Sequence, residues 1–267
     1  MPLDEYTRKR DFAKTPEPSG ARKTRARKTR QTASLYFCVQ KHLASRLHYD
    51  LRLEHNGVLL SWAVPKGPSL DHRDKHMAVQ TEDHPYDYGD FEGVIPEGYG
   101  AGIVMLWDHG TWQPEVEDVD AALRKGDLKF TLDGYKLKGS WVIVRTRDRP
   151  NTSPSQRGRS WLLIKHRDFW SGALDITTFA PLSVKSEGDF DDILAADMPD
   201  LWVTGRPSRG GATGKRLQEI IDKAAVKIIE REERQAKTTK QTQYRTSGTR
   251  RAPGRTSTTK ASTRGSE

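Results

Sequence analysis

Between residues 35 and about 170, short apolar runs alternate with clusters of glycine, proline and aspartate. The dipeptide Asn56-Gly57 separates two such runs and is a strong signal for a two-residue hairpin, because both turn positions favour positive φ. The pattern predicts eight strands, over 35–40, 48–54, 58–64, 77–82, 103–107, 128–132, 141–145 and 161–166, with one weak helical segment at 118–125. This is typical of an all-β barrel or sandwich. We expect a mainly β fold, a closed barrel of about eight strands with few short helices, because closure removes exposed strand edges.

The charge of the chain is unevenly distributed. Residues 1–34 carry 10 basic and 4 acidic side chains, residues 206–267 carry 16 and 6, and the intervening part carries 19 and 26. A mildly acidic body therefore lies between two basic arms. Basic arms attract phosphate backbones by releasing counterions, which favours a nucleic-acid partner. The alternative is that these arms only keep the protein in solution.

Three segments are predicted along the chain. Residues 1–33 form a basic N-terminal arm, residues 34–183 form the β domain, and residues 184–267 contain a linker, a basic helix and a disordered basic tail. The helix is expected at about 214–236, where Leu217, Ile220 and Ala224 follow a helical spacing. Low hydrophobicity and repeated like charges predict disorder around residues 19–34 and after residue 237.

Several classes of protein are disfavoured. No apolar run approaches the roughly 18 residues that span a bilayer, and the N-terminus lacks an apolar signal core. A single cysteine, Cys38, cannot form an internal disulfide or a cysteine cluster for zinc. A buried position is expected for Cys38, and a cytoplasmic location without membrane contact is expected for the protein.

Six of the eight histidines lie between residues 42 and 84. In a strand, His48, Asp50 and Arg52 would share one face, because side chains alternate with period two. His42 would fold in from the preceding loop. Two imidazoles and a carboxylate are a plausible mixed site for Mn²⁺, Zn²⁺ or Fe²⁺. The neighbouring guanidinium suits a phosphate group. The alternative is a polar strand face without function.

A second polar group follows at Glu82 and His84, which would share a face if the strand persists. A histidine at a strand end is a candidate proton donor or phosphate contact. Lys66, in a Pro-Lys-Gly-Pro turn, could add a cation, although turn lysines are usually solvated. The glycines around Tyr99 lack the Gly-Lys-Ser/Thr of a phosphate-binding loop and predict a tight turn.

Long parts of the sequence resemble the 3′-phosphoesterase domain of bacterial DNA ligase D, a family that also occurs as free-standing proteins. The resemblance is carried by FCVQKHLASRLHYDLRLEHNGVLLSWAVPKGPSL, TEDHPYDYGDFEGVIPEGYGAG and WDHGTW, and it extends to RKRDFAKTPEP and WLLIKHRD. It covers roughly residues 5–180. It implies a β-barrel that uses a divalent metal, preferably Mn²⁺ with Co²⁺ or Zn²⁺ as alternatives. The implied activity removes a 3′-terminal ribonucleoside and then the 3′-phosphate, which leaves a 3′-OH.

The resemblance also assigns roles to residues of this chain. Metal binding is implied for His42, His48 and Asp50. Catalysis and phosphate binding are implied for Arg52, Lys66, His84 and Tyr88, with Glu82 in support. Substrate contacts are implied for Arg10, Asp11, Glu17 and Gln40, so residues 10–17 of the N-terminal arm are expected at the active site. His76 stands where the family usually has arginine. Because histidine is mostly neutral at pH 7, this replacement would weaken the binding of phosphate.

The implied partners are primer–template 3′ ends of DNA, including ribonucleotide-tipped ends, and a separate DNA ligase with its end-joining machinery. A monomer associated with the nucleoid is expected. The alternative function is a non-catalytic nucleic-acid-binding accessory protein of a DNA ligase. That alternative would not need the set formed by His42, His48, Asp50, Arg52 and His84.

Overall fold

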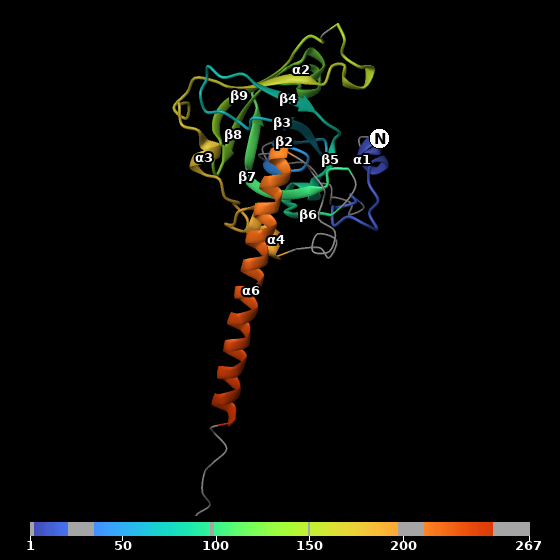
Figure 1. The fold of residues 1–267 in the computed structure, drawn as a ribbon. Helices are drawn as coiled ribbons and strands as arrows, with labels where there is room; N and C mark the ends of the chain where they lie inside the picture. Colours follow the sequence, from blue (N-terminus) through green and yellow to red (C-terminus); the bar gives the residue numbers. More distant parts are fainter. Residues whose placement is uncertain (1–2, 21–34, 97–98, 149, 197–210, 248–267) are drawn as a thin grey trace, which may run out of the picture. The chain divides into compact units, whose positions relative to one another are not determined.

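The computed structural model describes residues 3–20, 35–96, 99–148, 150–196 and 211–247 (Figure 1). The chain forms two compact units, residues 1–224 and 225–267. Of the stretches predicted to be disordered, residues 21–34 and 248–267 lie outside the described residues, and so do residues 197–210 of the predicted linker. Residues 238–247, also predicted to be disordered, are helical.

Eight strands close into an antiparallel barrel. They follow the order β1-β2-β3-β4-β10-β9-β8-β7, and β1 also pairs with β7. Two short strands lie off this ring, where β5 pairs with β3 and β6 pairs with β7. The predicted closed barrel of about eight strands is confirmed. The strands are β1 (Leu35–Leu43), β2 (Leu47–His55), β3 (Val58–Val64), β4 (His76–Gln80), β5 (His84–Pro85), β6 (Gly93–Ile95), β7 (Gly102–Pro114), β8 (Asp127–Gly134), β9 (Lys138–Arg145) and β10 (Ser160–Lys165).

Two hairpins position the polar face of β2. Asn56 and Gly57 have φ values of 50° and 81°, which confirms the predicted tight turn between β2 and β3. In the hairpin of β1 and β2, His42 lies directly opposite His48. The expectation that His42 folds in from a loop is wrong. Strand β1 continues through His42 to Leu43 because it is paired on both sides, with β2 and with β7.

The alternation along β2 decides which side chains face the core. Tyr49 and Leu51 line the barrel interior together with Leu132, Trp141 and Leu163 from the opposite wall. The space between these side chains measures only about 10 Å³, at the lower limit for one water molecule, so this part of the interior is a packed core. The alternating polar residues of β2 therefore lie on the outer face of the barrel wall.

A second, smaller apolar cluster covers part of this outer face. Tyr6, Leu59 and Tyr88 are buried against one another, and Phe12 and Phe91 pack against them. These residues come from the N-terminal segment, from β3 and from the chain around η1. The cluster therefore attaches the N-terminal segment and η1 to the outside of the barrel, next to the polar face of β2.

The helices are α1 (Asp4–Arg8), η1 (Tyr86–Asp90), α2 (Val119–Lys125), η2 (Pro154–Gln156), α3 (Ile176–Phe179), α4 (Phe190–Ala196) and α6 (Gly211–Ser247). Helix α2 matches the predicted segment. Asp118 caps it by accepting a hydrogen bond from the Ala121 N–H, and Gly126 ends it at φ 85°. Helix α6 is longer than predicted, and its residues Leu217, Ile220 and Ala224 are buried. No helix among the described residues is long and apolar enough to span a membrane.

Candidate metal centre and active-site cavity

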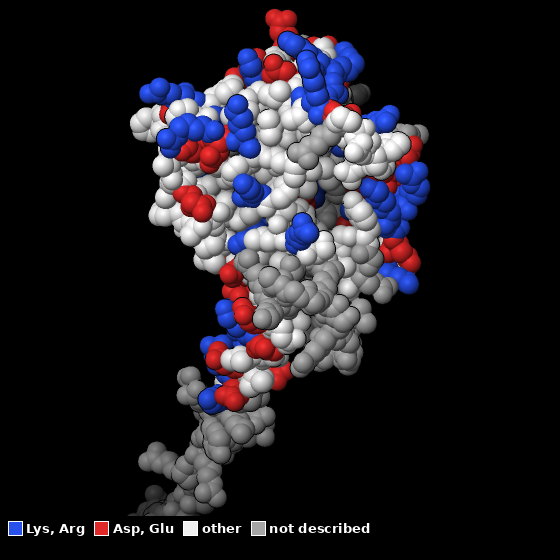
Figure 2. All heavy atoms as spheres, turned by 45° about the horizontal axis from the view of Figure 1, so that its top comes forward, with Lys and Arg blue, Asp and Glu red and all other residues white. Residues whose placement is uncertain are grey.

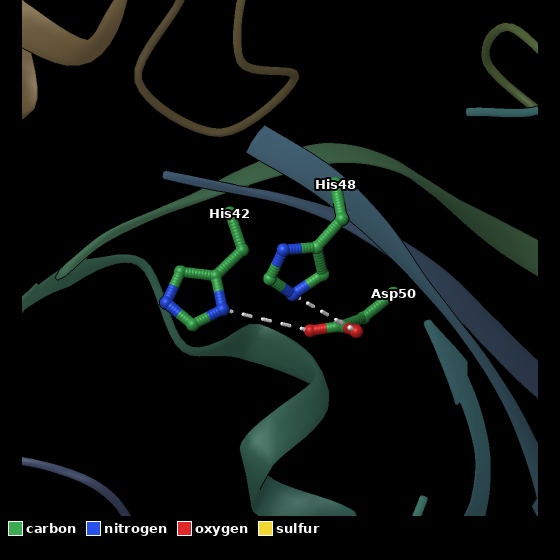
Figure 3. A group of neighbouring side chains, drawn as sticks. All are labelled: His42, His48 and Asp50. Carbon is green, nitrogen blue, oxygen red and sulfur yellow. Dashed lines mark ion pairs between the residues drawn. The ribbon is translucent and has the colours of Figure 1, made fainter. Parts of the chain in front are cut away.

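Three side chains of the β1–β2 hairpin converge on one point (Figure 3). The Nδ1 atom of His42 lies 3.8 Å from Oδ2 of Asp50, and the Nε2 atom of His48 lies 3.6 Å from Oδ1 of Asp50. The ligand atoms of all three residues are within 4.8 Å of one another. Zn²⁺ and similar ions hold such ligands at about 2.0–2.2 Å, so two ligands of one ion lie up to about 4.4 Å apart, which is close to the spacing of these three side chains.

Hydrogen bonds fix which nitrogen of each imidazole faces the carboxylate. His42 donates from Nε2 to the carbonyl oxygen of Gly100 at 2.9 Å, and His48 donates from Nδ1 to the carbonyl oxygen of Arg46 at 3.0 Å. In the neutral form of each ring, the other nitrogen carries a lone pair that points towards Asp50. Burial also lowers the pKa of His42, although Asp50 partly offsets this. Backbone carbonyls that orient imidazoles in this way are characteristic of metal sites.

The carboxylate of Asp50 is held in its ionised form. Burial raises its pKa, but the charges of His48 and Arg52 outweigh this and leave the pKa well below its usual range. Arg52 donates from Nη2 to Asp50 at 3.2 Å, from Nε to Gln40 at 2.6 Å and from Nη1 to Ser61 at 2.9 Å. Gln40 in turn donates to the carbonyl oxygens of Tyr88 and Phe91. The guanidinium is thus fixed by three side chains of the barrel wall.

The N-terminal segment supplies a second buried guanidinium. Arg10 donates from Nε to Glu17 at 2.8 Å and from Nη1 to Glu82 at 3.1 Å, and its side chain is only 4% exposed. Lys9 donates to the other oxygen of Glu82 at 2.9 Å. The Arg10 guanidinium also stacks 3.9 Å from the centre of the Tyr6 ring. These contacts join residues 9–17 to the chain between β4 and β5.

His84 lies at the centre of this polar network. Its Nδ1–H donates to the Glu82 carbonyl oxygen at 2.8 Å, so Nε2 carries the lone pair, 3.4 Å from Nη2 of Arg10. Burial, followed by the charges of Arg52 and Arg10, places the pKa of His84 well below its usual range, so the imidazole is neutral. Tyr88 donates its hydroxyl to Glu17 at 3.0 Å, and burial keeps its pKa well above the usual range.

A cavity of about 170 Å³ joins these groups. Eight of the predicted site residues line it, namely Arg10, His42, His48, Asp50, Arg52, Glu82, His84 and Tyr88. Gln40 and Glu17 are buried and bonded to members of this lining. Asp11 lines a neighbouring cavity instead. The structure does not bring Lys66 or His76 to either cavity. Lys66 is exposed in the turn after β3, and His76 donates from Nδ1 to the carbonyl oxygen of Gly67 at 2.6 Å.

Three residues at the site were not identified from the sequence. Ser61 bridges Arg52 and the Nδ1 atom of His84, which lies 3.2 Å from its hydroxyl. Ser61 is the one hydroxyl residue within the apolar run of β3, and this feature of the sequence could have identified it. Lys9 pairs with Glu82, and Tyr99 lines the cavity. Neither residue has a local sequence feature that separates it from an ordinary surface residue.

The half-buried Asp83, between Glu82 and His84, gives a pH-dependent prediction. Burial raises its pKa from 3.8 to about 6. Because the pKa is higher in the folded state, stability is lost as the pH rises from about 4 to about 6, and the cost persists above that range. We expect Asp83→Asn to raise the free energy of unfolding at pH 7.5 by about 1–3 kcal/mol, a gain that disappears at pH 4. Urea unfolding at both pH values measures this, and equal gains at both would contradict it.

Comparison with known proteins identifies the chain's relatives. Residues 40–145 match the family described as the DNA Ligase D 3′-phosphoesterase domain. The multifunctional non-homologous end joining protein LigD of Pseudomonas aeruginosa is 47% identical over 237 residues, which are 86% of this chain and 26% of the relative. The protein of the same name from Mycobacterium bovis is 43% identical over 145 residues, 54% of this chain and 18% of the relative. The chain thus spans about a quarter or less of the length of these relatives.

Proposed function

We propose that this chain, whose residues 40–145 belong to the DNA ligase D 3′-phosphoesterase domain family, is a metal-dependent phosphoesterase that trims 3′ ends of DNA for repair. The observation that carries the proposal is the convergence of His42, His48 and Asp50 in one cavity with Arg52 and His84. A protein that only binds nucleic acid has no need for buried, oriented metal ligands. The names of the relatives, which refer to non-homologous end joining, support DNA ends as the substrate.

The proposed metal is Mn²⁺, with Co²⁺ or Zn²⁺ as alternatives. The fit rests on the donor set, because two imidazoles and one ionised carboxylate suit a divalent ion of intermediate softness. The bound ion would act as a Lewis acid on a phosphate oxygen. The proposed substrates are primer–template ends that carry a 3′-phosphate or a 3′-terminal ribonucleoside, and the product is a 3′-OH that a ligase can join. We propose that the protein acts as a monomer in the cytoplasm, on the DNA of the bacterial nucleoid.

Other residues of the chain would bind the phosphate, donate the proton and contact the DNA. Among the described residues, the contacts of Arg52 occupy three of its five N–H groups, which leaves two for phosphate oxygens. A phosphate in the cavity would raise the pKa of His84 through its negative charge, so that Nε2 gains a proton and can donate it to the leaving oxygen. Water would be the nucleophile. Lys66, an exposed cation, would contact DNA outside the cavity, and His76 would do so more weakly than an arginine.

The function is tested with a primer–template that carries a 3′-phosphate. We expect the purified chain to release phosphate and leave a 3′-OH in the presence of Mn²⁺, and to do neither in excess EDTA. A parallel substrate with a single 3′-terminal ribonucleoside should yield a 3′-phosphate and then a 3′-OH. Tight DNA binding without turnover under any of the three metals would contradict the proposal and favour an accessory binding protein.

A further inference from the structure

A second cavity lies beside the one that contains the metal ligands. It has a volume of about 320 Å³ and is lined mainly by Lys9, Asp11, Lys14 and Thr15 of the N-terminal segment. Arg10 and Tyr99 line both cavities, so these two side chains form the boundary between them. The space-filling view shows Lys and Arg side chains gathered on the side of the barrel where α1 lies (Figure 2).

The two volumes suit different parts of a substrate. Binding pockets for small organic molecules generally measure about 300–1,000 Å³. The cavity that contains the metal ligands (the inner cavity), at about 170 Å³, falls below this range and suits a phosphate group with an ion. The second cavity (the outer cavity), at about 320 Å³, is large enough for one further unit of the substrate. A phosphodiester whose phosphate is bound by Arg52 would place one of its two organic substituents in the outer cavity.

The charges of the outer cavity favour an uncharged substituent. Its wall combines the cations Lys9, Arg10 and Lys14 with the carboxylates Asp11 and Glu17, and Arg10 is itself paired with Glu17 and Glu82. Lys9 is already paired with Glu5 and Glu82. A continuing DNA strand would bring further phosphates against the two carboxylates. A nucleoside has no phosphate, and its hydroxyls can donate to a carboxylate such as Asp11, as ribose hydroxyls do in dinucleotide-binding proteins.

Tyr99 supplies an aromatic surface at the boundary. Its side chain is 51% exposed, although it lines both cavities. Lys9 Nζ lies 4.7 Å from the centre of its ring and Arg10 Cζ lies 5.7 Å from it. These cations hold the ring at the junction, while half of its surface remains available. Bases stack on such exposed rings without regard to sequence, because every base has a π face.

We propose that the outer cavity is a subsite for the leaving nucleoside of a phosphodiester and that Tyr99 is its base-stacking platform. The inference rests on the proposed function. Water adds its oxygen to phosphorus, the P–O5′ bond breaks, and O5′ takes a proton. The products are a DNA 3′-phosphate and a free nucleoside. In the second hydrolysis, which removes that phosphate, no nucleoside is present, so Tyr99 contributes to the first reaction far more than to the second.

The test compares two primer–templates of identical DNA sequence, one ending in a single ribonucleoside and the other in a 3′-phosphate. Alanine substitution of a stacking aromatic ring costs roughly tenfold to a hundredfold in affinity. We expect Tyr99→Ala to lower kcat/KM, mainly through KM, at least about tenfold more on the ribonucleoside end than on the 3′-phosphate end. Tyr99→Phe should retain the wild-type ratio. Tyr135→Ala, which removes another exposed ring, should leave both rates unchanged.

Equal losses on the two ends would overturn the inference, because they would mean that Tyr99 only supports Arg10 or contacts the retained strand. Unchanged rates on both ends would overturn it as well. Failure of the proposed function is recognised separately, as absence of metal-dependent hydrolysis by the wild-type chain. In that event, binding of free adenosine, followed by saturation-transfer NMR, still tests the subsite. Wild type and Tyr99→Phe should bind it, Tyr99→Ala should bind at least about tenfold more weakly, and equal binding by all three would overturn the subsite.

Discussion

Asp50→Asn should lower the metal-dependent rate of 3′-phosphate hydrolysis by roughly a thousandfold or more, since a bound ion contributes several kcal/mol to stabilising the developing charge. Asparagine keeps the shape of the side chain and an oxygen that can accept from Arg52, but it removes the negative charge that faces both imidazoles. The loss should therefore appear in metal affinity, measured by isothermal titration of Mn²⁺, as well as in turnover.

Glu54→Gln is the matched control for this variant. Glu54 lies on the same strand and the same face as Asp50, but it accepts a hydrogen bond from the Tyr36 N–H and does not line the cavity. We expect it to bind metal and turn over like the wild type, and both variants should keep cooperative thermal unfolding. Full activity of Asp50→Asn in the presence of Mn²⁺ would show that the triad is not the metal centre.

Arg10→Met should lower the free energy of unfolding by about 3–5 kcal/mol at pH 7.5, as breaking a buried ion pair typically does. Methionine preserves much of the packing against Tyr6 but leaves the carboxylates of Glu17 and Glu82 without their shared guanidinium. Urea unfolding at constant salt measures the loss. Activity should fall as well, because Arg10 lines the cavity and contacts His84.

The pH dependence of this loss checks its cause. Burial raises the pKa of Glu82, but hydrogen bonds from Lys9 and Arg10 outweigh this and lower it. Because a lowered pKa stabilises the fold above the unfolded value and loses that effect as pH falls, the difference between Arg10→Met and wild type should shrink below about pH 4. Arg8→Met, at an exposed position in α1, should change stability by less than about 0.5 kcal/mol. A comparable loss in Arg8→Met would mean that removing any basic residue of the segment has this effect.

The parts of the fold that the sequence predicted depend on local pattern. The period-two alternation of β2 placed His48, Asp50 and Arg52 on one face, and Asn56-Gly57 fixed the register of the next hairpin. The buried position of Cys38 is confirmed too, and burial raises its thiol pKa to about 12. Each of these features follows from a few consecutive residues.

The parts that the sequence did not reveal depend on distant pairing. Strand β1 reaches His42 because β7, more than 60 residues later, pairs with it through Val104. The contact of Arg10 with Glu82 joins residues 72 positions apart. The family resemblance pointed to both residues but could not say that they touch. Lys66, which matches the family, and His76, which departs from it, show the converse, since correspondence to a family position does not by itself place a side chain in the cavity.

The three proposed metal ligands all belong to one hairpin, in which the three-residue loop 44–46 joins Leu43 to Leu47 and places His42 opposite His48. Contacts between residues so close in sequence have a small loop-closure cost and can form early in folding, whereas the ring of strands closes only when β1 meets β7. The proposed ion-binding half of the site thus has low contact order, and the half built by the contacts of Arg10 with Glu82 and of Tyr88 with Glu17 has high contact order. A nascent chain can therefore bring His42, His48 and Asp50 close together early, whereas the ring of His42 gains its hydrogen bond to Gly100, and the substrate cavity forms, only when β7 pairs with β1.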